Sequence, residues 1–460
     1  MEKEKKEDIQ SLTRRKFIAD GALIASVFTI IPRYVMGGPG YVPPSDKLNI
    51  ACVGVGGKGR VDLDGVSTEN IIALCDVDEV QATKKLKQFD ENAYEANPKA
   101  RKYKDFRVML EKEKDIDAIT VSTPDHMHAI ITMTAMKMGK NVYTQKPLTR
   151  IISESRIITN FAKKAGIVTQ MGNQGHANEG PRILNELIWQ GAIGKVHEVH
   201  CWTDRPIWPQ GIPNRPKDEP QVPSTLDWDL WLGITNYRPY NPAYVPFAWR
   251  AWWDFGCGAL GDMGCHVMDY PFWTLKLKSP LSIEAYSTKV FEETAPLGSV
   301  IHYDFISGLD STPVKLIWYD GGLKPPVPEG LKSDVNLLKP ILPWSGVLFK
   351  GELGEIVYGH HSPKPILLIN GKEYDYEMPK EMIPRSIGHY KEWIAECKGG
   401  KQKAMSNFDY AGPLTEVVLL GNVALRAGQK LYWDAAKMEF PNAPKANKFL
   451  HYEYRDGWNL

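Results

Sequence analysis

The chain has 460 residues, which is enough for two domains that each bury a core. Hydrophobic residues make up 43% and charged residues 24%, an ordinary globular composition that argues against disorder and against a polytopic membrane protein. Lys and Arg (56) nearly balance Asp and Glu (55), so the overall charge gives no reason to expect nucleic acid as a partner.

Residues 1–37 have the layout of a twin-arginine signal peptide. Arg14 and Arg15 precede an apolar run from Ala22 to Ile31, and small residues follow it. The run is about half of the roughly 20 residues that a membrane-spanning helix needs. We therefore expect a periplasmic or otherwise exported protein without an integral membrane span after signal removal, and residues 38–46 read as a linker. The alternative is an ordinary basic, amphipathic N-terminus.

Residues 47–171 are predicted to form a dinucleotide-binding Rossmann domain. An apolar, strand-like run ends in a glycine-rich turn followed by a helical stretch, and the next apolar run ends at Asp76. Glycines let a backbone approach a pyrophosphate at a helix N-terminus, and an acidic residue about 20 positions later binds the adenosine ribose. The candidate cofactor-binding residues here are Gly54, Gly56, Gly57, Gly59, Arg60 and Asp76.

The residues after Asp76 favour NAD over NADP. Val77 and Asp78 follow it where a 2′-phosphate site would carry Arg or Lys, and a second carboxylate would repel that phosphate.

Two further strand ends are expected to reach the same crevice. A β-branched run ending at Val121 precedes Thr123, Pro124 and His128, and a run ending at Thr144 precedes Gln145 and Lys146. Ligands bind beyond the carboxyl ends of parallel strands, so these residues join the predicted cofactor site, with Lys146 near the reacting atoms. A solvated surface lysine before a proline is the other interpretation of Lys146.

Residues 172–440 are predicted to form the substrate domain. Nine of the fourteen tryptophans lie between Trp189 and Trp273, where they would either pack on sugar rings or build a core. Asp262 and His266 are four residues apart, which places both on one face of a helix. A histidine can accept a hydroxyl proton and a carboxylate can orient it, although a capping Asp and a buried His would give the same pattern. The candidate substrate-binding residues are Asn173, Trp249, Arg250 and Asp269.

The six cysteines are not spaced like a disulfide framework or a zinc site, so no metal is expected.

Residues 281–357 alternate apolar and polar side chains in strand-length runs, which predicts an antiparallel sheet with one covered face. Leu414 to Ala427 is predicted to be an amphipathic helix, and residues 441–460 a tail that packs back on the domain.

With these motifs in order, the chain resembles the glucose-fructose oxidoreductase and inositol dehydrogenase (Gfo/Idh/MocA) family, and most closely its exported, Trp-rich bacterial branch. The resemblance implies an α/β fold with an N-terminal Rossmann domain and a C-terminal α/β domain whose open, mostly antiparallel sheet often makes homo-oligomers. It implies NAD or NADP as cofactor and sugars or cyclitols as substrates. Gln145-Lys146-Pro147 corresponds to the family's Glu-Lys-Pro, so Lys146 takes the role of the active-site lysine, and Asp262 and His266 match the family's Asp and His.

The predicted function is therefore that of an NAD(P)-dependent oxidoreductase acting on CH-OH groups of carbohydrates, with Lys146, Asp262 and His266 as catalytic residues and a tightly bound cofactor. His266 would remove a hydroxyl proton, Lys146 would donate to the oxygen, and Asp262 would position His266 or a neighbouring hydroxyl. Two alternatives remain open. One is a glycosidase or lyase that uses NAD transiently, and the other is a non-catalytic NAD- or sugar-binding protein.

Overall fold

The computed structural model describes residues 46–331 and 342–460. The predicted signal peptide and nearly all of the predicted linker lie outside these ranges. Residues Leu48–Leu460 form one compact unit by their contacts, so the predicted division at residue 172 does not separate two bodies and its position stays a prediction.

The first sheet is parallel and has six strands in the spatial order β3-β2-β1-β4-β5-β6. Its strands are β1 (Asn49–Val53), β2 (Asn70–Cys75), β3 (Arg101–Tyr103), β4 (Ala118–Val121), β5 (Asn141–Thr144) and β6 (Thr169–Met171). The intervening helices are α3 (Lys58–Gly65), α4 (Glu79–Ala82), α5 (Ala93–Ala96), α6 (Phe106–Lys112), the 3-10 turn η3 (Asp125–Met127), α7 (His128–Lys137) and α8 (Ile152–Ala165). The central strands are apolar because helices cover both faces of a parallel sheet. The strand order reverses direction between β1 and β4, and a crevice opens at such a point.

The second sheet has nine strands in the order β14-β13-β12-β11-β7-β10-β9-β8-β15, and only β7 and β10 pair in parallel. Its strands are β7 (Val196–Trp202), β8 (Ser282–Ser287), β9 (Ser299–Ile306), β10 (Pro313–Tyr319), β11 (Gly346–Gly351), β12 (Glu355–Gly359), β13 (Ile366–Ile369), β14 (Lys372–Tyr374) and β15 (Leu431–Tyr432). The predicted α/β fold with a parallel sheet and a mostly antiparallel sheet is confirmed. The sequence analysis did not identify β7, which lies between β11 and β10 in the sheet and precedes β8, the next strand along the chain, by about 80 residues.

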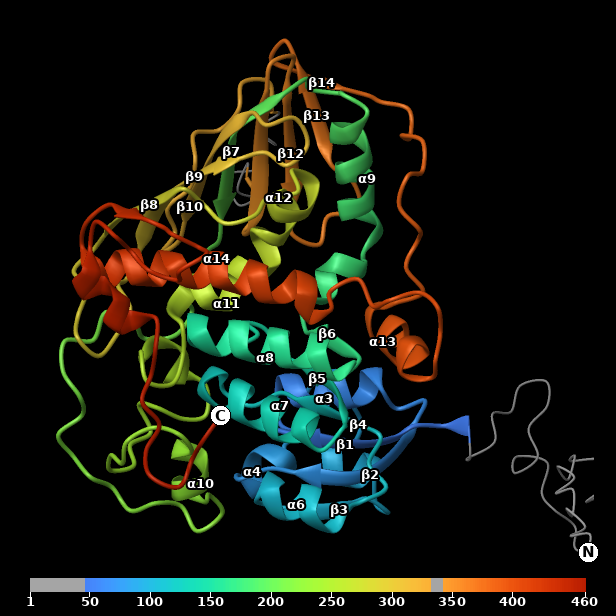
Figure 1. The fold of residues 1–460 in the computed structure, drawn as a ribbon, viewed down its shortest axis with the longest axis vertical. Helices are drawn as coiled ribbons and strands as arrows, with labels where there is room; N and C mark the ends of the chain where they lie inside the picture. The colour runs from blue at the N-terminus through green and yellow to red at the C-terminus, as the bar shows by residue number, and fades with distance from the viewer. Residues whose placement is uncertain (1–45, 332–341) are drawn as a thin grey trace, which may run out of the picture. The chain divides into compact units, whose positions relative to one another are not determined.

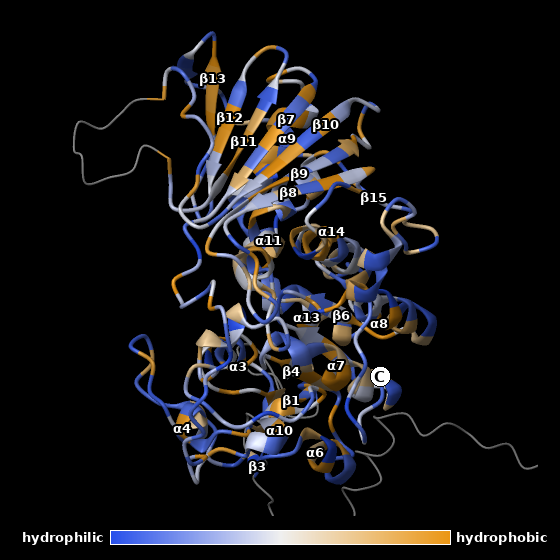
Figure 2. Ribbon diagram, turned by 90° about the vertical axis from the view of Figure 1, so that its left-hand side faces the viewer, coloured by the Kyte–Doolittle hydropathy of each residue, from blue (hydrophilic) through white to orange (hydrophobic). Residues whose placement is uncertain are grey.

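The remaining helices are η4 (Gln174–Ala177), α9 (Glu179–Trp189), α10 (Trp228–Leu232), η5 (Ala248–Ala251), α11 (Gly258–Val267), α12 (Asp269–Thr274), α13 (His389–Cys397), α14 (Phe408–Ala427) and η6 (Pro444–Phe449). Of these, α9 and α12 lie beside the second sheet, α11 and α14 lie between the two sheets, and α10 and α13 lie beside the first sheet (Figure 1). Figure 2, turned by 90°, shows α11 and α14 between the second sheet and helix α8.

Helix α14 is longer and more buried than its sequence predicts. It begins at Phe408, six residues before the predicted start, because Asn407 caps it and Pro413 is accommodated inside it. The helix contacts α8, α11 and β8, so it is buried on most of its circumference instead of being amphipathic. This one helix therefore connects the cores beneath the two sheets.

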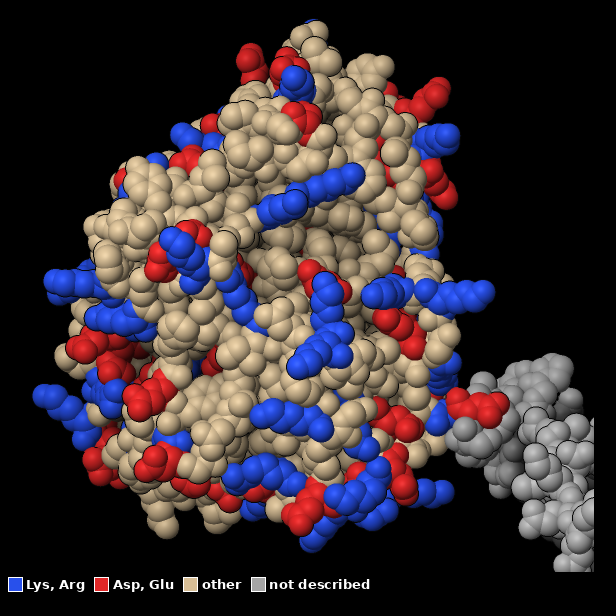
Figure 3. Space-filling model, in the orientation of Figure 1, with Lys and Arg blue, Asp and Glu red and all other residues tan. Residues whose placement is uncertain are grey.

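On the face drawn in Figure 3, Lys and Arg side chains are interspersed with Asp and Glu. Within the described ranges, no helix combines the length and apolar character needed to cross a membrane. All six cysteines are free thiols.

Candidate active site

The glycine-rich turn after β1 closes tightly against the end of β4. Gly54 has a φ of +74°, and a Cβ built on it would lie 2.7 Å from the backbone oxygen of Ser122. A Cβ on Gly59 would lie 1.8 Å from the oxygen of Gly54. Only glycine permits both the backbone conformation and these approaches, so the turn brings helix α3 directly onto the strand ends.

Asp76, at the end of β2, braces this turn from the neighbouring strand. Its carboxylate accepts hydrogen bonds from the backbone N–H of Val55 (2.9 Å) and of Gly56 (3.3 Å). Burial raises the pKa of Asp76, while these amide donors act in the opposite direction. The side chain is therefore held at the rim of the turn, in the place predicted for ribose recognition.

A cavity of about 480 Å³ begins at the glycine turn and continues past the ends of β4 and β5 to helix α11. Its size is within the range of cofactor and substrate pockets. Of the predicted site residues, it is lined by Gly54, Gly56, Gly57, Asp76, Thr123, Pro124, His128, Gln145, Lys146, Trp249, Arg250, Asp262 and His266. Residues from both halves of the chain thus meet at one pocket.

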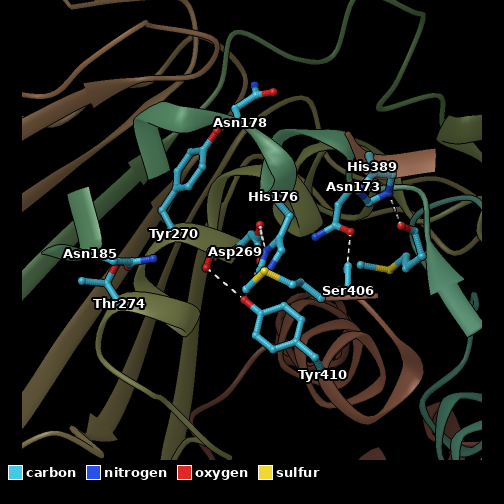
Figure 4. Close-up of polar contacts among 12 residues, drawn as sticks. Asn173, His176, Asn178, Asn185, Asp269, Tyr270, Thr274, His389, Ser406 and Tyr410 are labelled. Atoms are coloured by element: carbon cyan, nitrogen blue, oxygen red, sulfur yellow. Dashed lines mark hydrogen bonds and ion pairs between the residues drawn. The ribbon is translucent and has the colours of Figure 1, made fainter. Parts of the chain in front are cut away.

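Four predicted site residues do not line this cavity. Gly59 packs under the turn, and Arg60 turns away from it, with its guanidinium 4.0 Å from the centre of the Phe89 ring. Asn173 and Asp269 belong to the buried polar cluster of Figure 4. Asn173 accepts a hydrogen bond from Ser406, whereas Asp269 binds Tyr410 and His176. These four contacts give the residues a structural explanation, and their ligand-binding roles stay predictions.

Lys146 and Asp262 form the charged centre of the pocket. Lys146 Nζ lies 2.9 Å from Asp262 Oδ1, and Arg250 Nε lies 3.2 Å from the same oxygen. Burial acts to raise the pKa of Asp262, but the charges of Lys146 and Arg250 outweigh it, so the net shift is downward. Asp262 therefore stays ionised and fixes the lysine ammonium at the pocket wall.

His266 lies on the same helix, α11, and lines the same pocket. Its Nδ1 is buried and has no hydrogen-bond partner among the described residues. Burial and the positive charge of Lys146 hold the pKa of His266 well below its usual value, so the imidazole is neutral near pH 7. Asp262 is engaged by Lys146 and Arg250, and no hydrogen bond joins it to His266 among the described residues. The predicted role of Asp262, positioning His266 or a neighbouring hydroxyl, stays a prediction.

His128 joins the two strand-end turns from behind. Its Nδ1 lies 2.8 Å from the oxygen of Pro147 and its Nε2 lies 2.9 Å from the oxygen of Thr123. Burial lowers the pKa of His128 to about 4, so the ring is neutral and donates one of these hydrogen bonds. It therefore fixes the spacing between the turn after β4 and the turn that carries Lys146.

Two family models match this chain. The model described as "Oxidoreductase family, NAD-binding Rossmann fold" matches residues 48–173, and that described as "Oxidoreductase family, C-terminal alpha/beta domain" matches residues 202–310. The chain belongs to the Gfo/Idh/MocA oxidoreductase family. The first sheet and its helices form an NAD-binding Rossmann domain, and the glycine turn and the carboxylate of Asp76 fit that cofactor.

Curated relatives match parts of the chain. Levoglucosan dehydrogenase from Pseudarthrobacter phenanthrenivorans is 27% identical over 165 residues, which cover 36% of this chain and 34% of the relative. A glycosyl hydrolase family 109 protein from Shewanella pealeana is 28% identical over 210 residues, which cover 40% of this chain and 44% of the relative. The chain thus spans less than half the length of each of these relatives.

The fold is also that of solved structures. The WlbA dehydrogenase from Bordetella pertussis, in complex with NADH and UDP-GlcNAcA, superposes with a TM-score of 0.59 at 15% identity over 84% of this chain and 99% of that one. At this identity the likeness concerns the fold alone.

The departure from the family's Glu-Lys-Pro at Gln145 has a physical reason in this member of the family. The Gln145 amide donates to both carboxylate oxygens of Asp62, at 3.0 and 2.8 Å, and Asp62 is fully buried in helix α3. Asp62 also accepts from Lys58 and from Tyr390. A glutamate at position 145 would place two carboxylates in contact, so the amide is the side chain that fits here.

Asp125 is a pocket residue that the sequence analysis did not single out. It lies in η3, directly after Pro124, and is 5% exposed. Burial raises its pKa to about 7, against the opposing charges of Arg250 and Lys146. The only sequence signal was its position at the end of a predicted strand, and that signal gave no indication of its burial.

The pocket is covered by segments distant in sequence. The backbone near Leu226 pairs with Asp78, and Asp227 N–H donates to the oxygen of Val77, just beyond the strand end that carries Asp76. Trp231, Phe247 and Trp458 line the pocket beside the Rossmann residues. Arg455 contacts Asp229 at 2.7 Å and so ties the C-terminal tail to α10. The cover therefore comes from the second half of the chain and from its last residues.

No group of three or more potential metal ligands is found within the described ranges. The residues of the pocket instead supply backbone amides at one end and cations, a carboxylate and a neutral imidazole at the other.

Proposed function

We propose that this family member is an NAD-dependent oxidoreductase that oxidises a ring hydroxyl carbon of a sugar, glycoside or cyclitol. The observation that carries the proposal is that Lys146, Asp262 and His266, from segments over 100 residues apart, meet in the pocket that begins at the glycine turn. NAD, when bound by the Rossmann residues, supplies the hydride acceptor.

The residues of the reaction centre have complementary roles. His266 is neutral and has a free ring nitrogen, so it can accept the proton of a substrate hydroxyl. Lys146, held by Asp262, donates hydrogen bonds to the same oxygen and stabilises negative charge that develops on it. Arg250 packs on Trp249 at 4.2 Å and lies beside Asp262, where it can orient further hydroxyls of the ring.

The cover over the pocket supports a tightly held cofactor. Residues 225–227 pair with the segment after Asp76, and Trp458 from the tail closes on the same side. A dinucleotide enclosed in this way would leave only when these contacts open. We therefore propose that it stays bound between turnovers and that a second carbonyl substrate, such as another sugar, takes the hydride back from the bound NADH.

The experiment is mass spectrometry of nucleotide released from the purified protein, followed by a panel of sugars, glycosides and cyclitols assayed for ketone product. We expect NAD and an oxidised product, with activity lost in Lys146→Met and His266→Ala while the nucleotide is retained. A protein that binds a sugar but never oxidises it would support the non-catalytic alternative. Absence of any bound or bindable dinucleotide would overturn the proposal.

A second candidate is a glycosidase that uses NAD transiently, and the match to a glycosyl hydrolase family 109 protein favours considering it. Oxidation of a ring carbon acidifies the neighbouring C–H, so elimination, water addition and reduction can follow with the same residues. Simple oxidation forms one NADH for each ketone, on the enzyme or in solution, until a second carbonyl substrate reoxidises it. Glycoside cleavage without net NADH would assign the second function.

We also propose that the enzyme is exported with its cofactor already bound, since the twin-arginine layout of residues 1–37 is typical of a route for folded proteins. Fractionation of cells that express Arg14→Lys/Arg15→Lys beside the unchanged chain tests export. The homo-oligomer that the family resemblance implies is tested by light scattering of the purified protein.

A further inference from the structure

A second, smaller cavity lies behind the reaction centre, between the start of α8 and the end of α14. Its volume is about 30 Å³, which is roughly the space of one water molecule. Arg150 and Arg426 line it, together with Trp253, Cys257, Asn422 and Phe449. Figure 1 shows that α8, which begins two residues after Arg150, and α14, which holds Arg426, run side by side. The cavity does not share a lining residue with the cofactor pocket.

Arg150 is buried with two of its three guanidinium nitrogens unsatisfied. The side chain is 6% exposed, and Nη1 donates to the backbone oxygen of Trp253 at 2.8 Å. Nε and Nη2 are buried and have no hydrogen-bond partner among the described residues. The Tyr452 ring lies 4.1 Å from the guanidinium carbon and covers one face of it. Burying charged donors without acceptors strongly destabilises a fold. We therefore expect a further hydrogen-bond acceptor to occupy the space beside Arg150.

Arg426 brings a second guanidinium to the same cavity. It packs on the rings of Phe449 and Trp253, at 4.0 and 5.3 Å, is only partly buried, and makes no hydrogen bond or ion pair with any described residue. Burial and the charge of Arg150 lower its pKa to about 10. Two like charges thus face one small space, each increasing the need for a negative partner.

The nearest carboxylates are occupied elsewhere. Glu154 accepts from Tyr454 and from the backbone of Ile151, and burial raises its pKa. Asp254 is bound by Arg238 and accepts from Tyr452. Neither one forms an ion pair with Arg150 or Arg426.

We propose that Arg150 and Arg426 bind a small monovalent anion of the halide class, chloride in the cell, in this cavity. A halide accepts hydrogen bonds from several directions and neutralises charge, whereas a water molecule offers acceptors without charge. The small volume favours a halide over the larger tetrahedral oxyanions such as phosphate and sulfate. Ile152, the first residue of α8, also lines the cavity, and the positive end of the helix dipole adds to the attraction. The bound ion would join α8, α14 and the C-terminal segment that carries Phe449 and Tyr452.

The direct test is a crystal of the intact protein grown with bromide in place of chloride, measured at the bromine absorption edge. We expect an anomalous peak within hydrogen-bond distance of both guanidinium groups. A cavity that refines as water, or as empty, with no anomalous signal would overturn the proposal. An anomalous signal found only at surface positions would overturn it equally.

The second test is thermal unfolding in sodium chloride and in sodium gluconate of the same ionic strength. Because the ion binds the folded state only, each tenfold rise in chloride above its dissociation constant should raise Tm by about 1–2 °C, and gluconate should not. Equal Tm values in the two salts would contradict the proposal.

Two variants make the measurement specific. In Arg426→Met the chloride-dependent shift should disappear. In Arg156→Met it should persist, because Arg156 joins the same two helices through Glu416, at 2.6 Å, without reaching the cavity. A shift that is lost equally in both variants would indicate general loosening of the helix pair and would count against an anion site.

Discussion

The two ends of the large pocket are built in opposite ways. At the proposed dinucleotide end, the glycine turn and the carboxylate of Asp76 that braces it lie within residues 54–76, a short stretch of chain. At the reaction end, charged side chains from the turn after β5, from η5 and from α11 converge across more than 100 residues. The first end depends on backbone geometry that a single methyl group disturbs, and the second depends on a balance of charges.

This contrast predicts that damage at the reaction end removes turnover while leaving the cofactor in place. The largest effect is expected for Lys146→Met, which should lower kcat by about 10²–10⁴-fold because the developing oxyanion loses its charged donor. Bound NAD per protein chain should remain unchanged. The exposed Lys164→Met, at the end of α8, serves as the control for loss of a lysine. If Lys146→Met lost bound NAD as well as turnover, the two ends of the pocket would not have separate roles, and the prediction would be contradicted.

At the other end, Gly54→Ala should remove dinucleotide binding and lower the free energy of unfolding by about 2–5 kcal/mol. About 1–2 kcal/mol of this comes from the positive φ and the remainder from the contact with Ser122. Gly139→Ala is a matched control, since Gly139 has the same φ of +74° but nothing within 4 Å of the position its Cβ would take. Denaturant titration should show a clearly smaller loss for Gly139→Ala, and similar losses would refute the role of close approach.

Gln145 lies between the two ends and tests the charge balance. Gln145→Glu should destabilise the fold by about 1–3 kcal/mol at pH 8, because it sets a second carboxylate against Asp62. The pKa of the new carboxyl would be raised in the folded state, so the loss should shrink as pH falls towards 5, where the protonated acid can donate. Gln145→Met removes the donors without adding charge and should show no such pH dependence in chemical denaturation.

Asp125 gives the reaction end its own pH dependence. Its folded pKa is about 7 and its usual value is 3.8, so the folded state binds the proton more tightly. Its stabilising contribution is complete below about pH 4 and is lost progressively as pH rises to about 7, at about 1.4 kcal/mol per pH unit. Asp125→Asn stays neutral, so its stability relative to the unchanged chain should increase between pH 5 and pH 7 in urea titrations. A constant difference across this range would refute the raised pKa.

The smallest effect is expected at the cover. Trp458→Ala should speed NAD dissociation about tenfold, measured by exchange with labelled NAD, with little change in kcat for the first turnover. Trp344→Ala, whose side chain is 68% exposed, should leave the dissociation rate unchanged. If the NAD dissociation rate of Trp458→Ala equals that of the unchanged chain, Trp458 does not retain the cofactor.

The sequence by itself determined the elements that depend on residues close together in the chain. A buried strand, a glycine turn and an acidic strand end specify a dinucleotide site within about 30 residues, and period-two patterning indicated part of the second sheet, from β8 to β11. The spacing of Asp262 and His266 placed both on one face of α11, where the structure has them.

Only the tertiary structure decided which side chains face one another. In the folded protein Asp262 forms ion pairs with Lys146 and Arg250. Asp125 lines the pocket, whereas Asn173, Asp269 and Arg60 do not. The fold also brings Asp62 into hydrogen-bond contact with Gln145, and it brings Arg150 and Arg426 to the lining of one small cavity. Spacing along a chain fixes the direction of a side chain relative to its own helix or strand. Burial, pKa and charge partners depend on the neighbours that distant segments supply, and no local pattern in the chain encodes those neighbours.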